Sequence, residues 1–363
     1  MLVSFAGIFT FAGGLKAIAK VNVFQMLLLI GVSLTLTILG IIKVGGLYNV
    51  YHGVPSEFWN LIRPASDPKY PWVAILLGYP VSAVAFFCTD QAMVQSVLGA
   101  KSLEQGQMGV NFIGWLKILS LPLFILTGVL CFILFPNLKD PNEAYMTMVT
   151  NLFPPGMNGL VIVVLIAVLV GTIGSSLNAL STVFTMDVYV KKINPTASNK
   201  DIIRMGRITV VVGCIIAVLM VLAIDNIKGL NLFDIFQSIL GFIAPPLAVV
   251  FLLTVFWKRT TQLAVNLILS VGSAFSLGVG VMYLWIFTPD KYPIWPHYLM
   301  LSFYIFAVLT LAAVVISLIN SKGVVFEHSA VHGDLVKPTK RVWILWGALA
   351  AVMVVLYIVF NGH

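Results

Sequence analysis

Residues 78–117 decide the fold of this chain, and they read GYPVSAVAFFCTDQAMVQSVLGAKSLEQGQMGVNFIGWLK. Two apolar segments meet here, and each carries an ionisable residue away from its ends, Asp90 in the first and Lys117 in the second. An ionisable group in the middle of a bilayer costs at least about 2.5 kcal/mol, so such groups tend to face internal cavities and to mark functional sites. Pro80 and Thr89 accompany Asp90, a composition that predicts a broken helix. Helices that break at mid-membrane are typical of the solute sites of secondary transporters.

Composition places the chain in a membrane. Hydrophobic residues make up 60% of the 363 residues and charged residues only 9%, with a mean hydropathy of +1.03. Because a soluble domain carries about 25% charged residues, we expect a multi-pass protein of the plasma (cytoplasmic) membrane, with the lipid bilayer as a partner. The net charge of +8 does not indicate nucleic acid, since cytoplasmic loops alone give membrane proteins such an excess.

No pattern in the sequence indicates an enzyme. We find no nucleophile–base pair, phosphate loop or cluster with metal-ligand spacing, and we expect no cofactor beyond a coupling ion. Three cysteines lie in apolar runs, where we expect small buried residues: Cys88, Cys131 and Cys214. The histidines fall in loops or at chain ends: His52, His297, His328, His332 and His363.

Nine apolar runs are long enough to cross a bilayer, since a crossing helix needs about 20 residues. They cover residues 21–44, 71–98, 106–136, 157–190, 205–225, 231–257, 262–288, 296–319 and 342–360. We expect helices, because lipid offers no water to unpaired backbone groups. A shorter apolar run, Met1–Gly14, precedes them, and we expect the chain to begin inside a membrane helix, as a fragment or from a late start site.

The charges in the loops give the orientation. One alternate set of loops holds most of the Lys and Arg residues, including Lys191 and Arg204, and the positive-inside rule makes this set cytoplasmic. The charge-poor set, which includes Lys69 and Lys291, is then expected outside. The polar segment 320–341 is expected to be a solvated cytoplasmic tether without chemistry.

Two polar side chains in apolar runs are candidates for solute binding. Lys117 lies far from both ends of its run, so its ammonium does not easily reach water. It forms either a structural ion pair with Asp90 or Asp234, or hydrogen bonds to solute hydroxyls. Gln237 lies three residues after Asp234, and its amide offers two donors and an acceptor, which suits a neutral polyhydroxylated ligand. The alternative for Gln237 is a hydrogen bond between helices.

Small residues repeat every four positions in the span 157–190. One row holds Gly171, Ser175 and Ala179, and another holds Gly174, Asn178 and Thr182. Such rows let helices approach closely in lipid, so packing is the first interpretation. The second concerns Gly171 and Thr172, where a hydroxyl and nearby carbonyls replace the water shell of a small cation. Asp187, near the cytoplasmic end, is expected to pair with a basic loop residue.

Six stretches resemble the solute:sodium symporter family, most closely its sodium/glucose cotransporter branch. In chain order they are FAGGLKAIAKVNVFQ (11–25), FFCTDQAMVQSVLGAKSL (86–103), GWLK (114–117), LSTVFTMDVY (180–189), LFDIFQSI (232–239) and PPLAVVFLLTVFWKR (245–259). They follow the order of the family, which makes the resemblance far more specific than any single motif. Residues after 259 match the family in hydropathy only.

The resemblance implies an all-α, polytopic membrane fold of the inverted-repeat, LeuT-like transporter class, with solute and ion sites near the midplane. It assigns residues 1–44 to the end of the first repeat, 71–258 to the second inverted repeat and 262–363 to extra C-terminal helices of a single membrane domain. The family's first three helices have no counterpart here, so the fold is expected to be incomplete at its N-terminus.

The resemblance also implies roles for individual residues in solute binding. Lys117 and Gln237 match sugar hydrogen-bonding positions of the family, and Phe87 matches an aromatic residue of the broken helix. Phe86 stands where the sugar branch has a gating Tyr, and Ala83 stands where it has a polar sugar contact. These two departures leave the identity of the solute open.

The gate and ion residues are implied in the same way. Asp90 and Asp234 match acidic positions near the gates. At the sodium site, Val168 would give a backbone carbonyl and Thr172 a hydroxyl. Gly171 stands where a second hydroxyl is usual, which predicts weakened sodium coupling.

The sequence therefore predicts sodium-coupled symport of a sugar or polyol by alternating access. One alternative keeps the fold and changes the solute to an organic acid, an amino acid or a vitamin, with Lys117 as counter-ion to a carboxylate. Another is a non-transporting, truncated fragment. A membrane-embedded enzyme or the membrane domain of a sensor is disfavoured, because the chain lacks catalytic residues and an attached soluble domain.

Overall fold

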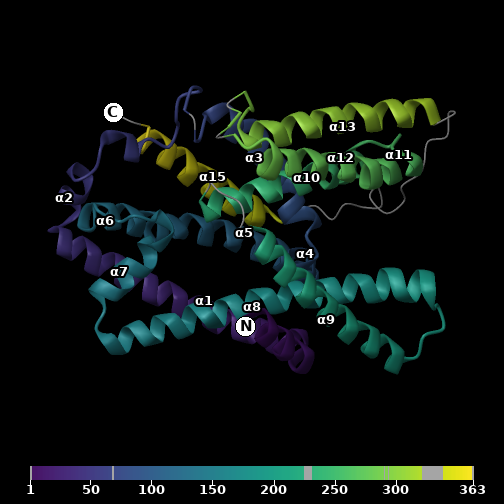
Figure 1. Cartoon of the computed structure of the whole chain (residues 1–363), viewed down its shortest axis with the longest axis horizontal. Helices are drawn as coiled ribbons and strands as arrows, with labels where there is room; N and C mark the ends of the chain where they lie inside the picture. The colour runs from purple at the N-terminus through teal and green to yellow at the C-terminus, as the bar shows by residue number, and fades with distance from the viewer. Residues whose placement is uncertain are drawn as a thin grey trace. The chain divides into compact units, whose positions relative to one another are not determined.

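The computed structural model describes residues 2–67, 69–224, 231–289, 291–292, 294–320 and 338–361, with side chains from residue 22 onward. The predicted tether 320–341, apart from its ends, lies outside the described residues, as do His328, His332 and His363. Regular structure within these ranges is helical (Figure 1), and a single isolated β-bridge joins Asn60 to Asn361.

Nine stretches of the described residues are helices long and apolar enough to cross a membrane. They are Asn22–Val44, Trp72–Thr89, Leu103–Leu134, Pro155–Ile193, Asn199–Ile224, Leu232–Phe256, Gln262–Ile286, Tyr298–Asn320 and Lys340–Val359. The predicted apolar runs are thus confirmed. One difference concerns the start of the chain, where the short run and the first full run belong to a single helix, α1 (Leu2–Val44).

The helices form two compact units. Unit 1 consists of Met1–Asn60, Gly99–Asp225 and Leu345–His363. Unit 2 consists of Leu61–Leu98 and Asn226–Ile344. The division into repeats at residues 44, 71, 258 and 262 follows a different principle, namely the resemblance to the family, and it stays a prediction.

Unit 1 is built on the long contact between α1 and α8 (Pro155–Val183), which Figure 1 shows crossing. The second half of α1 also packs against α6 (Leu126–Leu134) and α7 (Ala144–Leu152). Their apolar side chains form a buried core that includes Leu36, Leu130, Met148, Val149 and Val161. Burial of such side chains holds this part of the unit together, since each removes apolar surface from its surroundings and fills space at high density.

The remaining helices of unit 1 surround this core. They are α2 (Leu47–His52), η1 (Ser56–Trp59), α5 (Leu103–Ser120), η3 (Leu121–Ile125), η4 (Pro141–Glu143), η5 (Phe184–Ile193), α9 (Asn199–Ile224) and most of α15 (Lys340–Val359). The end of α1 has a local cause, because Gly45 adopts φ 95°, a left-handed conformation that suits glycine and stops a helix. In η5, the predicted partner of Asp187 is Lys191, with an N–O distance of 2.6 Å.

Unit 2 is organised around α10 (Leu232–Phe256), whose inner face is buried along most of its length. It packs against α3 (Trp72–Val84), α12 (Ser273–Val281) and α13 (Tyr298–Asn320). Figure 1 shows α13 running alongside α10 and α11. The unit also contains η2 (Ala85–Thr89), α4 (Gln91–Leu98), α11 (Gln262–Leu267), η6 (Ile268–Gly272) and η7 (Met282–Ile286).

A close helix contact fixes α3 against α13. The position that a Cβ atom would take at Gly78 is already occupied by the backbone carbonyl of Leu299. Only glycine allows this approach of two membrane helices, which is the usual role of small residues at such interfaces. The contact places the first turn of α13 beside the middle of α3.

Candidate functional site

The predicted break in the helix is present at Asp90. α3 passes into the π-helical segment η2, in which the Asp90 N–H donates to the Ala85 carbonyl at 3.2 Å, and α4 starts afresh at Gln91. Asp90 has an extended backbone, with φ −68° and ψ 120°, and its Oδ1 accepts the Met93 N–H at 3.0 Å. Asp90 is therefore the N-cap of α4, where a negative charge is favourable. This local role explains a carboxylate in the middle of an apolar run.

Gln237 is a buried polar group at the centre of unit 2. Only 8% of its surface is exposed, and its side-chain amide hydrogen-bonds none of the described residues. It lies on α10, which packs against both α3 and η2. Its amide atoms are not among the fully buried, unpaired polar atoms of the described residues, so they retain some accessible surface. The sequence left open whether Gln237 hydrogen-bonds a neighbouring helix. Among the described residues it forms no such bond, so its amide is available to a ligand.

Asp234 lies one turn before Gln237 and is engaged in local hydrogen bonds. Asn231 caps α10, with its Oδ1 accepting the Asp234 N–H at 2.8 Å and its Nδ2 donating to Asp234 Oδ2 at 2.7 Å. The Tyr70 hydroxyl, from the loop before α3, donates to Asp234 Oδ1 at 3.1 Å. Burial, and next the charge of Asp234, raise the pKa of Tyr70 to about 12, so the phenol remains a donor. The predicted polar network at Asp234 therefore contains a phenol and an amide.

The aromatic pair of the broken helix is partly open. The rings of Phe86 and Phe87 lie with centroids 5.1 Å apart and planes at 87°, an edge-to-face arrangement. Phe87 is 44% exposed, whereas Phe86 and Ala83 are partly buried. The π-helical turn of η2 contains both rings, and such turns are frequent at functional sites.

Lys117 lies on α5 in unit 1, and its side chain is exposed there. Among the described residues of this unit its ammonium has no hydrogen-bond or ion-pair partner, although its backbone carbonyl accepts a bond from the Ser120 hydroxyl at 2.6 Å. The α5 helix packs mainly on η3 and, at Gly114, on Leu349 of α15. The enclosure that the sequence predicts for this ammonium is therefore not supplied by unit 1 itself.

The three sodium candidates lie on α8, also in unit 1. The Thr172 hydroxyl donates to the Val168 carbonyl at 2.9 Å, which brings two oxygen atoms together on one face of the helix. The same bond joins Thr182 to the Asn178 carbonyl at 2.8 Å, so this hydrogen bond does not by itself single out Thr172. Oxygen ligands are those that hard cations prefer.

Gly171 faces two amides of α1 that sequence reasoning missed. A Cβ atom at Gly171 would lie 2.6 Å from Asn22 Oδ1 and 2.7 Å from Gln25 Oε1. Asn22 Nδ2 donates to Ser175 Oγ at 3.4 Å, and Ser175 Oγ donates to the Gly171 carbonyl at 2.9 Å. Amide oxygens thus stand close to the place of the missing hydroxyl. The signal that could have revealed them is the spacing of Asn22 and Gln25, two amides three positions apart in the stretch 11–25.

The candidate residues are thus divided between the units. Unit 2 brings together the aromatic pair, Gln237, Asp234 and the Asp90 cap on three elements in mutual contact, α3, η2 and α10. Unit 1 contains Lys117 and the α8 group. Tyr70 and Asn231 lie outside the motifs that sequence reasoning used, since one is in a loop and the other precedes the helix.

These observations define a multi-pass integral membrane protein with an all-α, LeuT-like transporter fold, as predicted. A solved structure supports the fold: "Substrate-bound outward-open state of a Na+-coupled sialic acid symporter reveals a novel Na+-site" aligns with a TM-score of 0.66 at 19% identity, covering 88% of this chain and 65% of that one. A sequence profile of the "Sodium:solute symporter family" matches residues 1–264. The chain belongs to this family.

The chain is also similar in sequence to individual curated transporters. Human sodium/myo-inositol cotransporter 2 is 30% identical over 295 residues, which cover 72% of this chain and 44% of the relative. Human sodium/glucose cotransporter 4 is 32% identical over 316 residues, which cover 78% of this chain and 46% of the relative. The chain thus spans about half the length of the curated relatives that it matches. These relatives are transporters and not enzymes.

Proposed function

We propose that the protein carries a sugar or polyol across the plasma (cytoplasmic) membrane by sodium-coupled symport with alternating access. Membership of the family and the names of the relatives, which are sodium/myo-inositol and sodium/glucose cotransporters, support the class of activity. The observation that carries the solute assignment is Gln237, a buried amide that bonds none of the described residues. A neutral polyol has the hydroxyl donors and acceptors that such a group lacks.

The solute site would contain Gln237, Lys117 and the η2 aromatic pair. Gln237 would exchange hydrogen bonds with solute hydroxyls, and Lys117 would donate to them as a strong charged donor. Phe86 and Phe87 would cover the apolar face of the solute, and Ala83 would leave room beside it. Because α10, α3 and η2 hold Gln237 and the two rings in one unit, this half of the site is preorganised.

Sodium would be bound on α8 by the Val168 carbonyl and the Thr172 hydroxyl. The amide oxygens of Asn22 and Gln25, next to Gly171, offer further neutral oxygen ligands in place of the hydroxyl that Gly171 lacks. The weakened sodium coupling predicted from Gly171 alone is therefore not part of this proposal. Sodium bound here would favour one conformation, and solute binding would then follow from the shifted population.

The test is uptake of labelled myo-inositol and glucose by proteoliposomes containing the purified protein, with and without an inward sodium gradient. Sodium-dependent uptake is expected, and collapse of the gradient with an ionophore should abolish it. Lys117→Ala should lower uptake about tenfold or more, since a hydrogen bond to a charged group contributes about 1.5–3 kcal/mol. Lys101→Ala, a matched change at an exposed loop position, should have no effect. Uptake that ignores sodium would contradict the proposal.

A second candidate solute is an organic acid, and Lys117 favours it specifically. An exposed ammonium with no partner in its own unit can serve as counter-ion to a carboxylate. The structural relative is named as a symporter of sialic acid, which carries such a group. A competition panel of labelled myo-inositol against sugars, carboxylated sugars, amino acids and vitamins separates the two, because the true solute should compete most strongly.

A further inference from the structure

A cavity lies in unit 2, and none of the candidate residues above lines it. Its volume is about 570 Å³, within the range of small-molecule sites. It lies between the loop before α3, the loop before α13 and the first turns of these two helices, with Ala74 and Met300 in its wall. Both loops belong to the charge-poor set, so the cavity is on the side that the loop charges assign to the outside.

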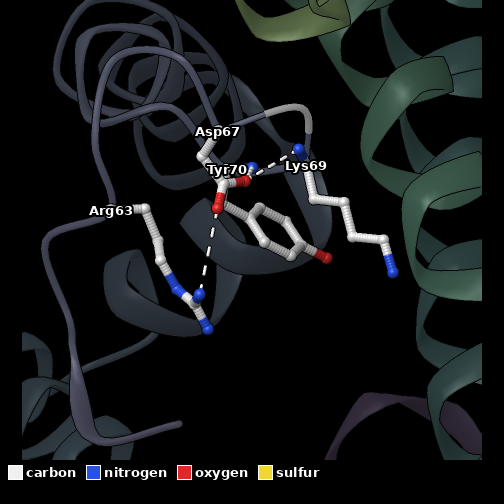
Figure 2. A network of polar contacts seen from close by, with 4 residues as sticks. All are labelled: Arg63, Asp67, Lys69 and Tyr70. Carbon is white, nitrogen blue, oxygen red and sulfur yellow. Dashed lines mark hydrogen bonds and ion pairs between the residues drawn. The ribbon is translucent and has the colours of Figure 1, made fainter. Parts of the chain in front are cut away.

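One wall of this outer cavity carries a carboxylate with a free oxygen. Asp67 Oδ1 accepts the N–H groups of Lys69 and Tyr70, both at 2.8 Å (Figure 2). These bonds, that of Tyr70 first, lower the pKa of Asp67 and keep it ionised. Asp67 Oδ2 accepts no hydrogen bond from the described residues, and its nearest cation, Arg63 Nη1, lies at 3.9 Å, too far for a hydrogen bond. Oδ2 therefore remains an acceptor for a ligand hydroxyl.

Another part of the lining is aromatic, and ring contacts hold it in place. Trp295 packs edge-to-face on Tyr283, with centroids 5.9 Å apart and planes at 79°. Tyr283 packs in turn on Phe242 of α10 at 5.6 Å. His297 is held next to the start of α13, because its Nδ1 accepts the Leu299 N–H at 3.3 Å. A rigid indole is a flat apolar surface that loses little entropy on binding.

The charges decide between two kinds of ligand. Asp67 alone would favour an organic cation, which the aromatic rings would also attract. Figure 2 shows the Arg63 guanidinium directed at the same carboxylate, while the Lys69 ammonium points away from it. A cation would therefore meet like charge at Arg63, whereas a neutral ligand with hydroxyl donors can use Asp67 Oδ2 and stack on the indole. The balance favours the neutral, polyhydroxylated ligand.

We infer that the outer cavity is a separate binding site for a neutral cyclic polyol or sugar, which stacks on Trp295 and donates a hydroxyl to Asp67 Oδ2. The site has a direct link to the start of α10, since the Tyr70 N–H binds Asp67 and the Tyr70 hydroxyl binds Asp234. The choice of probe rests on the proposed function, but the existence of the cavity and its two recognition groups does not.

The experiment is equilibrium binding of labelled myo-inositol and glucose to the purified protein, with and without sodium, in wild type and in variants of each site. Wild type is expected to show two binding components per chain. One depends on sodium and belongs to the proposed solute site at Gln237, and the other is independent of sodium and belongs to the outer cavity. Asp67→Asn retains an oxygen for the backbone N–H groups but replaces the free acceptor by a donor, and Trp295→Ala removes the indole. Each should weaken the sodium-independent component about tenfold or more. Trp295→Phe, which keeps a flat ring, should retain most of it.

Controls separate this inference from the proposed function. Gln237→Ala should remove the sodium-dependent component and leave the other intact; persistence of both components in this variant would contradict the proposed site at Gln237 and leave the outer cavity supported. Trp285→Ala, at an indole outside the cavity wall, should change neither. A single component, or a second one that survives both Asp67→Asn and Trp295→Ala, would overturn the inference. Displacement of the labelled polyol by tetramethylammonium at lower concentrations than by unlabelled polyol would overturn the ligand class.

Discussion

Two close helix contacts, one in each unit, differ in what they place at the point of approach. In unit 2, Gly78 of α3 meets the backbone carbonyl of Leu299 on α13. In unit 1, Gly171 of α8 meets the ends of two flexible side chains, Asn22 and Gln25 of α1. A backbone atom cannot move without moving its helix, whereas an amide can rotate away. The contact of unit 2 is therefore a rigid joint, and that of unit 1 is an adjustable polar region.

The difference matches the chemistry proposed for each unit. Gln237 and the η2 rings need a fixed geometry to recognise a solute, and the α3–α13 joint holds the helix that leads into η2. A sodium ion that binds and leaves needs oxygen ligands that can adapt, and the α1–α8 contact offers amides and hydroxyls of this kind. The comparison predicts different responses to the same substitution in the two contacts.

The largest effect is expected from glycine replacement at the rigid joint. Gly78→Ala should destabilise the protein by more than about 2 kcal/mol, because overpacking against a backbone carbonyl forces the helices apart. Gly171→Ala should cost less than about 1 kcal/mol, since the amides can turn aside and alanine favours the helix. Thermal unfolding followed by size-exclusion chromatography measures both. Equal losses of stability would remove the distinction between the two contacts.

A smaller effect is expected at the hydroxyl proposed to bind sodium. Thr172→Ala should raise the sodium concentration for half-maximal uptake about tenfold, which corresponds to about 1.4 kcal/mol. Thr182→Ala is the matched control, because Thr182 lies on the same helix, α8, and makes the same kind of hydrogen bond. Its hydroxyl donates to the Asn178 carbonyl. Its sodium dependence should stay that of wild type. A similar shift in both variants would assign the effect to helix packing.

The tie between Tyr70 and Asp234 should contribute less. Tyr70→Phe removes one hydroxyl and should lower the stability by about 1 kcal/mol, the usual contribution of a hydrogen bond. Tyr79→Phe, at a 48% exposed position of α3, is the control and should be neutral. Unfolding temperatures of the two variants give the comparison, and an unchanged value for Tyr70→Phe would mean that this bond does not hold the loop to α10.

The smallest effect is expected from pH at the outer loops. Burial lowers the pKa of His297 below its usual value near 6.5, although the Lys69 backbone, Asp234 and Asp67 oppose this shift. The unfolded chain then binds more protons than the folded one as the pH falls below about 6.5, so stability declines there by a fraction of about 1 kcal/mol. His297→Gln should flatten the dependence of unfolding temperature on pH between 5 and 7, as about 6.5 is the ordinary His pKa. An unaltered slope would assign the titration to another group.

The sequence was informative wherever local chemistry determines the structure. Apolar run lengths predicted the membrane helices, and the composition around Asp90 predicted the break, because both depend on neighbouring residues only. The environment of Lys117 was not predictable in this way, since it depends on which helices cover α5. Tyr70 was missed for a related reason, as it lies in a loop and its partner Asp234 is 164 residues away in the chain. Trp295 was missed because it lies in a loop outside the motifs, where it packs on Tyr283.

The most direct test of the account is the role of Gln237 in solute recognition. Initial rates of sodium-driven myo-inositol uptake into proteoliposomes should be measured for wild type, Gln237→Ala and Gln262→Ala, the last an exposed glutamine of the same unit. The account predicts that Gln237→Ala loses about tenfold in Vmax/KM, since about 1.4 kcal/mol of hydrogen bonding disappears, and that Gln262→Ala matches wild type. Wild-type uptake by correctly folded Gln237→Ala protein would contradict it.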